Sequence, residues 1–274
     1  MNTIYHYTDL NGFLNILKNK KLWLSATNNL NDYYEVDWIL HKLQQRLFNK
    51  TNEDKLELIN IFWEMRSRNM GIPYICSFSK NGDILSQWRA YADDGHGVAI
   101  GFNRIYFDFE VDFPTHHMSS EYTIGINDVV YDDNNQNIIV DNIAKLVLSA
   151  KNIEEGGENL LSAMELSRRA AYICKNPAFR EEDEVRIIHT PMIMGNQEGQ
   201  TPIYGNISDM KHRVTGKSIT SYFELDFSVL KDVNPVAEII LGPKSKLSRY
   251  DIETFLSLNG LENVPYTWST ASYR

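Results

Sequence analysis

The chain has 274 residues with a formal net charge of -9, and 43% of its residues are hydrophobic. A chain of this size and composition can bury a substantial core, which excludes a natively disordered protein. The acidic balance argues against a broad basic surface for DNA or RNA. The N-terminus does not resemble a signal peptide and no apolar run reaches the length of a membrane span, so we expect a cytoplasmic protein with no membrane partner.

The first predicted element is a strand at residues 3–8, TIYHYT. Its alternation places Ile4, His6 and Thr8 on one face. A helix follows, which Thr8 or Asp9 caps. The strand therefore carries a polar imidazole and a hydroxyl on the same side, among aromatic neighbours.

The remainder of the chain alternates between helical and strand patterns, without internal repeats or a Pro/Ser-rich linker. This order predicts one α+β domain over residues 1–274, with mixed or antiparallel central sheets and helices inserted between strands. We expect helices at 34–48, 53–65, 84–92, 136–153, 158–175 and 247–258, with Gly156 and Gly157 separating the two in the middle. We expect strands at 22–26, 72–79, 98–102, 106–113, 122–132, 179–190, 221–227, 237–242 and 265–269, and a long polar loop at 195–206.

The two cysteines, Cys76 and Cys174, occupy apolar contexts without the CxxC spacing of a zinc or redox site. We expect both to be reduced core residues. The pair His116-His117 has no histidine or carboxylate at i+4 spacing, and neither a dinucleotide-binding glycine motif nor a phosphate-binding loop occurs. We therefore expect no metal site.

An acidic cluster precedes the predicted strand at 179–190, where alternation puts Glu182 and Glu184 on one face. Two adjacent carboxylates repel, so the pKa of one should rise unless a cation such as Arg186 neutralises them. The pattern suits acid–base chemistry or the binding of sugar hydroxyls. A solvated acidic turn before a strand produces the same pattern, so both interpretations stay open.

Other polar and aromatic residues also allow two interpretations. His6 is either a half-buried, hydrogen-bonded ring or a ligand-binding group. Ser77 and Ser79 share a strand face, as a cross-strand hydroxyl ladder or as hydrogen-bonding groups for a ligand. Trp88 and Tyr91, one helical turn apart, are either core residues or a stacking platform.

Motifs spread over nearly the whole chain resemble an uncharacterised bacterial family, domain of unknown function number twenty-nine seventy-one. They are YHYT, LWLS, NDYYE, CSFS, LSQWRAYA, GHGVAIGF, FREEDEVR, EIILGP and WSTASYR. That family in turn resembles the ADP-ribosyltransferase fold, in which a first strand carries His or Arg, a second Ser or Tyr, and a later one Glu. The resemblance therefore implies an ADP-ribosyltransferase-like fold.

The same resemblance implies catalytic roles for His6, for Ser77 or Tyr91, and for Glu184. The chain mixes two patterns, because His6 is similar to the histidine-starting class and the Glu-x-Glu and Ser-Phe-Ser motifs are similar to the arginine-starting class. Two extra helices also separate the first element from the second, which leaves the middle catalytic position open between Ser77 and Tyr91.

NAD is the implied substrate, and its nicotinamide leaves through a cation-like ribosyl transition state that a carboxylate can stabilise. Glu184 would supply that carboxylate, and His6, with Thr8 behind it, would bind the adenosine ribose or the pyrophosphate. Tyr91 or Trp88 would stack on nicotinamide, and Glu182 would orient the acceptor. The expected substrate-binding residues are Thr8, Ser25, Asn31, Asp32, Glu35, Ser77, Ser79, Trp88, Glu182 and Arg186. For Asp32 and Glu35, a capping box at the start of a helix is a sufficient alternative.

The resemblance thus favours an NAD-dependent ADP-ribosyltransferase or NAD glycohydrolase, as a toxin or phage-defence effector, acting on an unknown protein or nucleic-acid acceptor. One alternative is a non-catalytic nucleotide- or protein-binding module of a bacterial defence system. Another is an RNA-acting nuclease that uses Glu182, Glu184 and His6, although the acidic balance disfavours it.

Overall fold

The computed structural model describes residues 2–29, 34–49, 55–68, 71–149, 153–195, 201–228 and 234–271, and the fold is α+β with a mixed, mostly antiparallel sheet. The helices are α1 (Leu10–Asn19), α2 (Tyr34–Asn49), α3 (Leu56–Arg68), α4 (Leu85–Tyr91), α5 (Asp133–Ser149), α6 (Ile153–Ile173) and α7 (Arg249–Leu258). The strands are β1 (Thr3–Thr8), β2 (Lys21–Ala26), β3 (Tyr74–Ser79), β4 (Val98–Asn103), β5 (Ile124–Asp128), β6 (Glu184–His189), β7 (Met192–Ile193), β8 (Ile203–Tyr204), β9 (Lys211–Thr215), β10 (Ser218–Asp226), β11 (Val236–Leu241) and β12 (Tyr266–Trp268).

The main sheet has the strand order β12-β11-β4-β1-β3-β2-β10-β9, and β3 also pairs with β6, which pairs with β5. β11 and β12 run parallel, whereas the other pairs of this sheet are antiparallel. β7 and β8 form a separate two-stranded sheet. The strand β3 is therefore central, with β6 along one edge and both β1 and β2 along the other.

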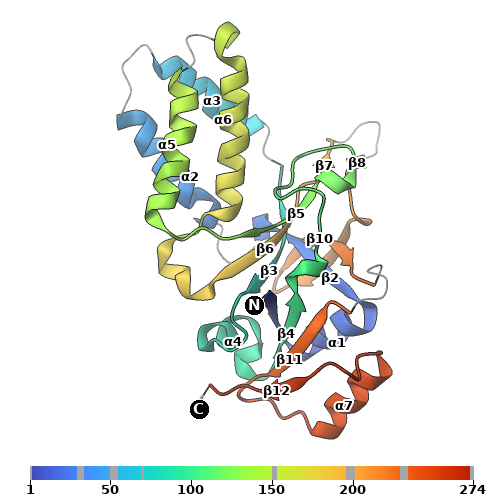
Figure 1. The fold of residues 1–274 in the computed structure, drawn as a ribbon. Coiled ribbons are helices and arrows are strands. Elements are labelled where there is room, and N and C mark those ends of the chain that lie inside the picture. The colour runs from blue at the N-terminus through green and yellow to red at the C-terminus, as the bar shows by residue number, and fades with distance from the viewer. Residues whose placement is uncertain are drawn as a thin grey trace.

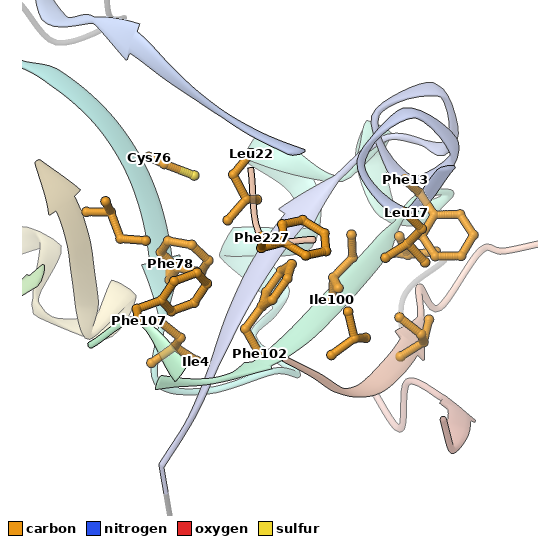
Figure 2. Close-up of a cluster of buried hydrophobic side chains, with 14 of the residues drawn as sticks. Ile4, Phe13, Leu17, Leu22, Cys76, Phe78, Ile100, Phe102, Phe107 and Phe227 are labelled. Atoms are coloured by element: carbon orange, nitrogen blue, oxygen red, sulfur yellow. The ribbon is translucent and has the colours of Figure 1, made fainter. Parts of the chain in front are cut away.

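The largest core lies on one face of this sheet and is closed by α1 and α7. Figure 2 shows phenylalanine rings from distant segments at its centre, with Phe102 between Phe78, Phe107 and Phe227. The ring centroid of Phe102 lies 5.9 Å from Phe78, 5.9 Å from Phe107 and 5.6 Å from Phe227. Tilted and edge-to-face contacts of this kind add to the stability that burial of the rings already provides.

Two further clusters cover the opposite face of the sheet. Helices α2, α3, α5 and α6 gather at one end of the molecule, and β4, β11, β12 and α7 lie at the other (Figure 1). Ile75 of β3 and Ile188 of β6 pack into the core of that helical layer. Near the other end, α4 buries Trp88 against Tyr7 of β1 and Ala99 of β4.

Two expectations from the sequence, a cap on α1 and buried free cysteines, are confirmed. Asp9 caps α1, because its carboxylate accepts a hydrogen bond from the backbone N–H of Gly12. Cys76 and Cys174 are free and buried. No described helix is both long and apolar enough to cross a membrane.

The strand expected at residues 106–113 is wrong. The chain leaves β4 through a short 3-10 turn at residues 104–106 and then runs without regular structure. Phe107 and Phe109 stack on each other, and Phe107 also contacts Phe78. Their rings are placed by the core rather than by a pairing strand, so the alternation of aromatic and acidic residues reflects burial alone.

The glycine boundary was also misplaced. α5 ends at Ser149, and both Gly156 and Gly157 lie inside α6. A glycine costs a helix about 1 kcal/mol relative to alanine. The buried face of α6, which includes Leu160 and Ala163, offsets that cost through packing in the helical layer.

Candidate functional site

The candidate site begins at a split in the sheet beside β3. β1 pairs with β3 at Tyr5 and Ser79, whereas β2 pairs with it at Ser25 with Ile75 and at Ala26 with Tyr74. We call the part of β3 between these two contacts, residues 76–78, the split. Backbone groups alternate between the two edges of a strand. The carbonyl of Ser77 therefore points toward the edge that faces β1 and β2, as do those of Ile75 and Ser79, which pair with β2 and β1.

His6 supplies the partner that a strand would otherwise provide. Its Nδ1 lies 2.9 Å from the carbonyl oxygen of Ser77. A carbonyl only accepts, so Nδ1 carries the proton and Nε2 keeps a lone pair that can accept a hydrogen bond from a ligand. Burial lowers the pKa of His6, the Ser77 carbonyl opposes this change, and the charge of Arg213 lowers the pKa further. The ring is therefore neutral near pH 7.

His6 also contacts two residues of β3 whose side chains belong to the main core, Cys76 and Phe78. Its ring centroid lies 5.6 Å from that of Phe78, and its Nδ1 lies 3.8 Å from the sulfur of Cys76. Burial raises the pKa of the Cys76 thiol to about 12. The thiol is consequently protonated and unreactive at neutral pH, so it offers no nucleophile to the site.

Ser77 is exposed although it lies in the middle of the central strand. Along the same face, Ile75 packs into the helical layer, while Ser79 is buried and its hydroxyl accepts a hydrogen bond from the N–H of Asn81. The hydroxyl of Ser77 lies on the same face as the carboxylate of Glu184 on β6 and helps to lower its pKa. Thus Ser77 is contacted by residues from distant segments on both faces of the sheet: Glu184 lies on the face of its side chain, whereas His6 binds its backbone carbonyl from the face of Cys76 and Phe78.

Glu184 is buried and held by two cations. Arg186 donates from Nε to Oε1 at 2.8 Å and from Nη2 to Oε2 at 2.9 Å, and Lys175 donates to Oε2 at 3.4 Å. Although desolvation raises the pKa of Glu184, these cations and the Ser77 hydroxyl lower it more, to about 2. A carboxylate with so low a pKa is a poor general base at neutral pH. It stays ionised, however, and can face a developing positive charge or accept a hydrogen bond from a sugar hydroxyl.

The acidic pair predicted from the sequence does meet, but through a different geometry. Glu182 ends a 3-10 helix at Pro177–Glu182 instead of sharing a strand face with Glu184, and Asp183 between them adopts a left-handed conformation with φ of 40°. Lys175 joins the two carboxylates, with its Nζ 2.6 Å from Oε2 of Glu182. The neutralising cation expected at Arg186 is thus accompanied by a second, Lys175, which the sequence analysis missed.

On the β2 side of the split lies an arginine that the sequence analysis also missed. Arg213 on β9 donates from Nη2 to the hydroxyl of Ser25 at 2.9 Å. Its guanidinium carbon lies 5.0 Å from the ring centroid of Trp23 and 5.9 Å from that of Tyr222. The segment KHRVTGKSIT could have indicated this position, because a glycine between two strand-like runs predicts a hairpin. It forms the β9–β10 hairpin, which turns at Gly216 with φ of 60°.

With this geometry established, comparison with known proteins adds one finding. Residues 87–187 match the family model of a protein of unknown function, DUF2971. The match confirms the resemblance to an uncharacterised family over that part of the chain. No curated protein and no solved structure matches the chain.

The DUF2971 match runs from α4 to β6, so it includes Glu184 and Arg186 and leaves out His6 and Ser77. Trp88 and Tyr91 also lie within it. Trp88 is fully buried and its indole N–H donates to Asp83 at 2.7 Å, so its ring is part of the core and cannot stack on a ligand. Tyr91 is exposed at the end of α4.

Of the other candidate residues, Thr8 has a structural role, and three lie wholly or partly outside the described residues. Thr8 packs against the first turn of α1, where a side chain at Gly12 would collide with its hydroxyl, so it does not share the contacts of His6. Asn31 and Asp32 lie outside the described residues, as does the side chain of Glu35. Among the described residues, no group of three or more His, Cys, Asp or Glu side chains is arranged to hold a metal ion.

Proposed function

We propose that the protein binds NAD at the split and breaks the bond between nicotinamide and ribose, transferring ADP-ribose to a macromolecular acceptor or to water. The observation that carries this proposal is that the exposed Ser77 shares a face of the sheet with the ionised carboxylate of Glu184, whose pKa its hydroxyl helps to lower. This arrangement places a permanent negative charge next to an accessible hydroxyl. The imidazole of His6 is hydrogen-bonded to the backbone carbonyl of the same residue, Ser77.

The chemistry requires such a charge. When the bond breaks, its electron pair leaves with nicotinamide and positive charge develops on the ribose. A carboxylate that is ionised before the reaction stabilises this charge without having to reorganise. The pKa of Glu184, about 2, guarantees that state across the physiological range. The acceptor then bonds to the same ribose carbon and loses its proton to solvent or to a nearby base.

Binding of the ribose would use the remaining polar groups of the site. Nε2 of His6 can accept a hydrogen bond from a ribose hydroxyl, because Nδ1 is already committed to the carbonyl of Ser77. The Ser77 hydroxyl has a lone pair to spare when it donates to Glu184. The two groups lie on neighbouring strands but on opposite faces of the sheet, because His6 is paired with Ile100 of the main core and Ser77 shares a face with Ile75, so a ligand that contacts both would have to pass through the split.

The test is the release of nicotinamide from NAD, measured by liquid chromatography with a cell lysate as the source of acceptors. We expect release by the wild-type protein, and a loss of about a hundredfold or more for Glu184→Gln. Ser77→Ala should be impaired less, because the carboxylate remains. Glu165→Gln is the matched control, since Glu165 also pairs with two arginines but lies in α6. Absence of release by the wild-type protein, or full activity of Glu184→Gln, would contradict the proposal.

A second function is favoured by the ion pairs of Glu184. Arg186 and Lys175 offset much of its negative charge, which weakens the stabilisation of a ribosyl cation. A module that binds NAD or a related nucleotide without cleaving it would have no need for that stabilisation. A rise in melting temperature with NAD, equal in the wild-type protein and Glu184→Gln and without nicotinamide release, would favour this function over catalysis.

A further inference from the structure

Arg213 is held in a fixed orientation at the rim of the split. The rings of Trp23 and Tyr222 lie beneath its guanidinium, and Nη2 donates to the hydroxyl of Ser25. Stacking on aromatic rings and a directed hydrogen bond both restrict a side chain that is otherwise flexible. The planar fork of donors is therefore set in one direction before any ligand arrives.

This guanidinium has a buried donor with no acceptor. Nε of Arg213 is inaccessible to water and makes no hydrogen bond, and no carboxylate among the described residues pairs with Arg213. Burial lowers the pKa of Arg213, but an arginine keeps its proton in any protein environment. A buried donor on a charged group without a partner is unusual. An anion would be bound through the two Nη nitrogens instead, of which Nη2 already donates one hydrogen bond to Ser25.

Two neighbouring cations on the same part of the sheet, unlike Arg213, do pair with a carboxylate. Lys21 on β2 and Lys211 on β9 both pair with Glu224, at 2.8 Å and 3.0 Å. Lys211 lies two residues from Arg213 on the same strand. One carboxylate, that of Glu224, thus pairs with both lysines, whereas no carboxylate of the described residues pairs with Arg213.

The position of Arg213 relates it to the rest of the site. Its hydrogen-bond partner Ser25 is paired with Ile75, two residues before Ser77 on β3. Its charge lowers the pKa of both His6 and Cys76, which lie on the split. A ligand in contact with Ser77 and His6 would therefore extend toward Arg213 on the β2 side.

We propose that Arg213, stacked on Trp23 and hydrogen-bonded to Ser25, binds a phosphate group of the ligand that occupies the split. The planar guanidinium can donate two parallel hydrogen bonds to two oxygens of one phosphate. The identity of the ligand rests on the proposed function, in which this phosphate belongs to the diphosphate of NAD. The ribose next to nicotinamide then lies at Ser77 and Glu184, and the diphosphate lies toward β2 and β9.

The experiment is calorimetric titration of the full chain with ADP, adenosine and inorganic pyrophosphate. Loss of charge-assisted hydrogen bonds to a phosphate weakens binding by about ten- to a hundredfold. We expect ADP and pyrophosphate to bind the wild-type protein, and Arg213→Gln to lose that factor of affinity for both. Adenosine should bind weakly and equally to both proteins. Arg213→Lys keeps the charge but not the fork, so its affinity should fall between the two.

Arg249→Gln is the matched control, because Arg249 also lies over an aromatic ring, that of Trp268, but on α7. Thermal unfolding of each variant shows whether it is folded, and Arg213→Lys keeps the proposal testable if Arg213→Gln does not fold. Equal affinities of ADP for the wild-type protein, Arg213→Gln and Arg213→Lys would overturn the phosphate site. Failure of ADP and pyrophosphate to bind the wild-type protein would overturn it as well.

These outcomes are distinct from those of the proposed function. Binding of ADP that depends on Arg213, without any release of nicotinamide, supports the phosphate site and contradicts the catalytic proposal. Release of nicotinamide that is unaffected in KM and kcat by Arg213→Gln supports the catalytic proposal and contradicts the phosphate site. Free pyrophosphate that binds more tightly than ADP would identify the source as an inorganic anion, and would remove NAD as the ligand.

Discussion

The imidazole of His6 lies where an antiparallel sheet would place another strand, with its Nδ1 2.9 Å from the carbonyl oxygen of Ser77. A side chain from β1 thus completes the hydrogen bonding of β3 at the position where β1 itself has moved away. This arrangement keeps the split open at Ser77 without leaving its carbonyl unsatisfied.

Replacement of His6 by alanine should therefore destabilise the fold. The carbonyl of Ser77 would lose its partner, at a cost of about 1 to 3 kcal/mol in the free energy of unfolding. Urea denaturation at pH 7 measures this change. The exposed His212 on β9 gives the control, and His212→Ala should stay within about 0.5 kcal/mol of the wild-type protein. Equal stability of the two variants would show that water replaces the imidazole at no cost.

The charge of Arg213 should be detectable at His6. Because Arg213 lowers the pKa of the imidazole, Arg213→Gln should raise the pKa of His6, whereas Arg249→Gln should not change it. Nuclear magnetic resonance of the imidazole nitrogens over a pH titration measures both the pKa and the tautomer. We expect the Nδ1-protonated neutral form at pH 7 in the wild-type protein. A pKa that is the same with and without Arg213 would place the guanidinium away from the split.

Glu184 predicts a loss of stability in acid. Its pKa is 4.5 in the unfolded chain and about 2 in the fold, so the stabilisation is complete above pH 4.5 and disappears as the pH falls toward 2. The difference corresponds to about 3 kcal/mol. Glu184→Gln should be less stable than the wild-type protein at pH 7, with a gap that narrows between pH 4.5 and pH 2 in urea denaturation. A gap that stays constant over this range would mean that the ion pairs do not stabilise the carboxylate.

His189 predicts a second loss of stability in a higher pH range. Its ring is fully buried, with Nδ1 3.1 Å from the carbonyl oxygen of Thr123, and burial lowers its pKa from 6.5 to about 4. Below pH 6.5 the unfolded chain takes up a proton that the fold rejects, so stability falls by about 3 kcal/mol between pH 6.5 and pH 4. His189→Gln should lack this part of the pH dependence, and His212→Gln should retain it. Identical profiles for the wild-type protein and His189→Gln would contradict the prediction.

Asp83 should anchor the end of the chain to α4. Its carboxylate accepts hydrogen bonds from the indole of Trp88, from the hydroxyl of Ser269, and from the N–H and hydroxyl of Thr270. Asp83→Ala should cost about 2 to 4 kcal/mol, because several donors lose their acceptor at once. Asp128→Ala removes two solvent-exposed ion pairs, with Lys80 and Arg104, and should cost under about 1 kcal/mol. Digestion with a carboxypeptidase should shorten Asp83→Ala faster than either the wild-type protein or Asp128→Ala.

Local periodicity was sufficient to predict the order of most elements. The apolar run at 98–102 became β4, which is buried on both faces, because such a run can only be satisfied inside a sheet. The alternation at 106–113 failed, since Phe107 and Phe109 reach the core from an irregular segment. Burial produces an alternating pattern whether or not a neighbouring strand is present, and a single sequence does not reveal the neighbour.

The candidate site was predictable only in part. Alternation correctly put Ser77 and Ser79 on one face, but nothing local indicated that the first would be exposed and the second buried under Asn81. Lys175 and Arg213 were missed because their roles depend on partners from other elements. Arg213 becomes notable only when the hairpin β9–β10 brings it over Trp23, which lies 190 residues earlier in the chain.

The strand order has a mechanical consequence. The group β12-β11-β4-β1 and the group β2-β10-β9 are neighbours of β3 and not of each other, and β1 joins β4 through six residue pairs but meets β3 at a single one. A ligand bound to His6 on one group and to Arg213 on the other would link the two groups of strands across the weakly paired edge of β3. Amide protons along β3 would then exchange with solvent more slowly, while those between β1 and β4 would keep their rates.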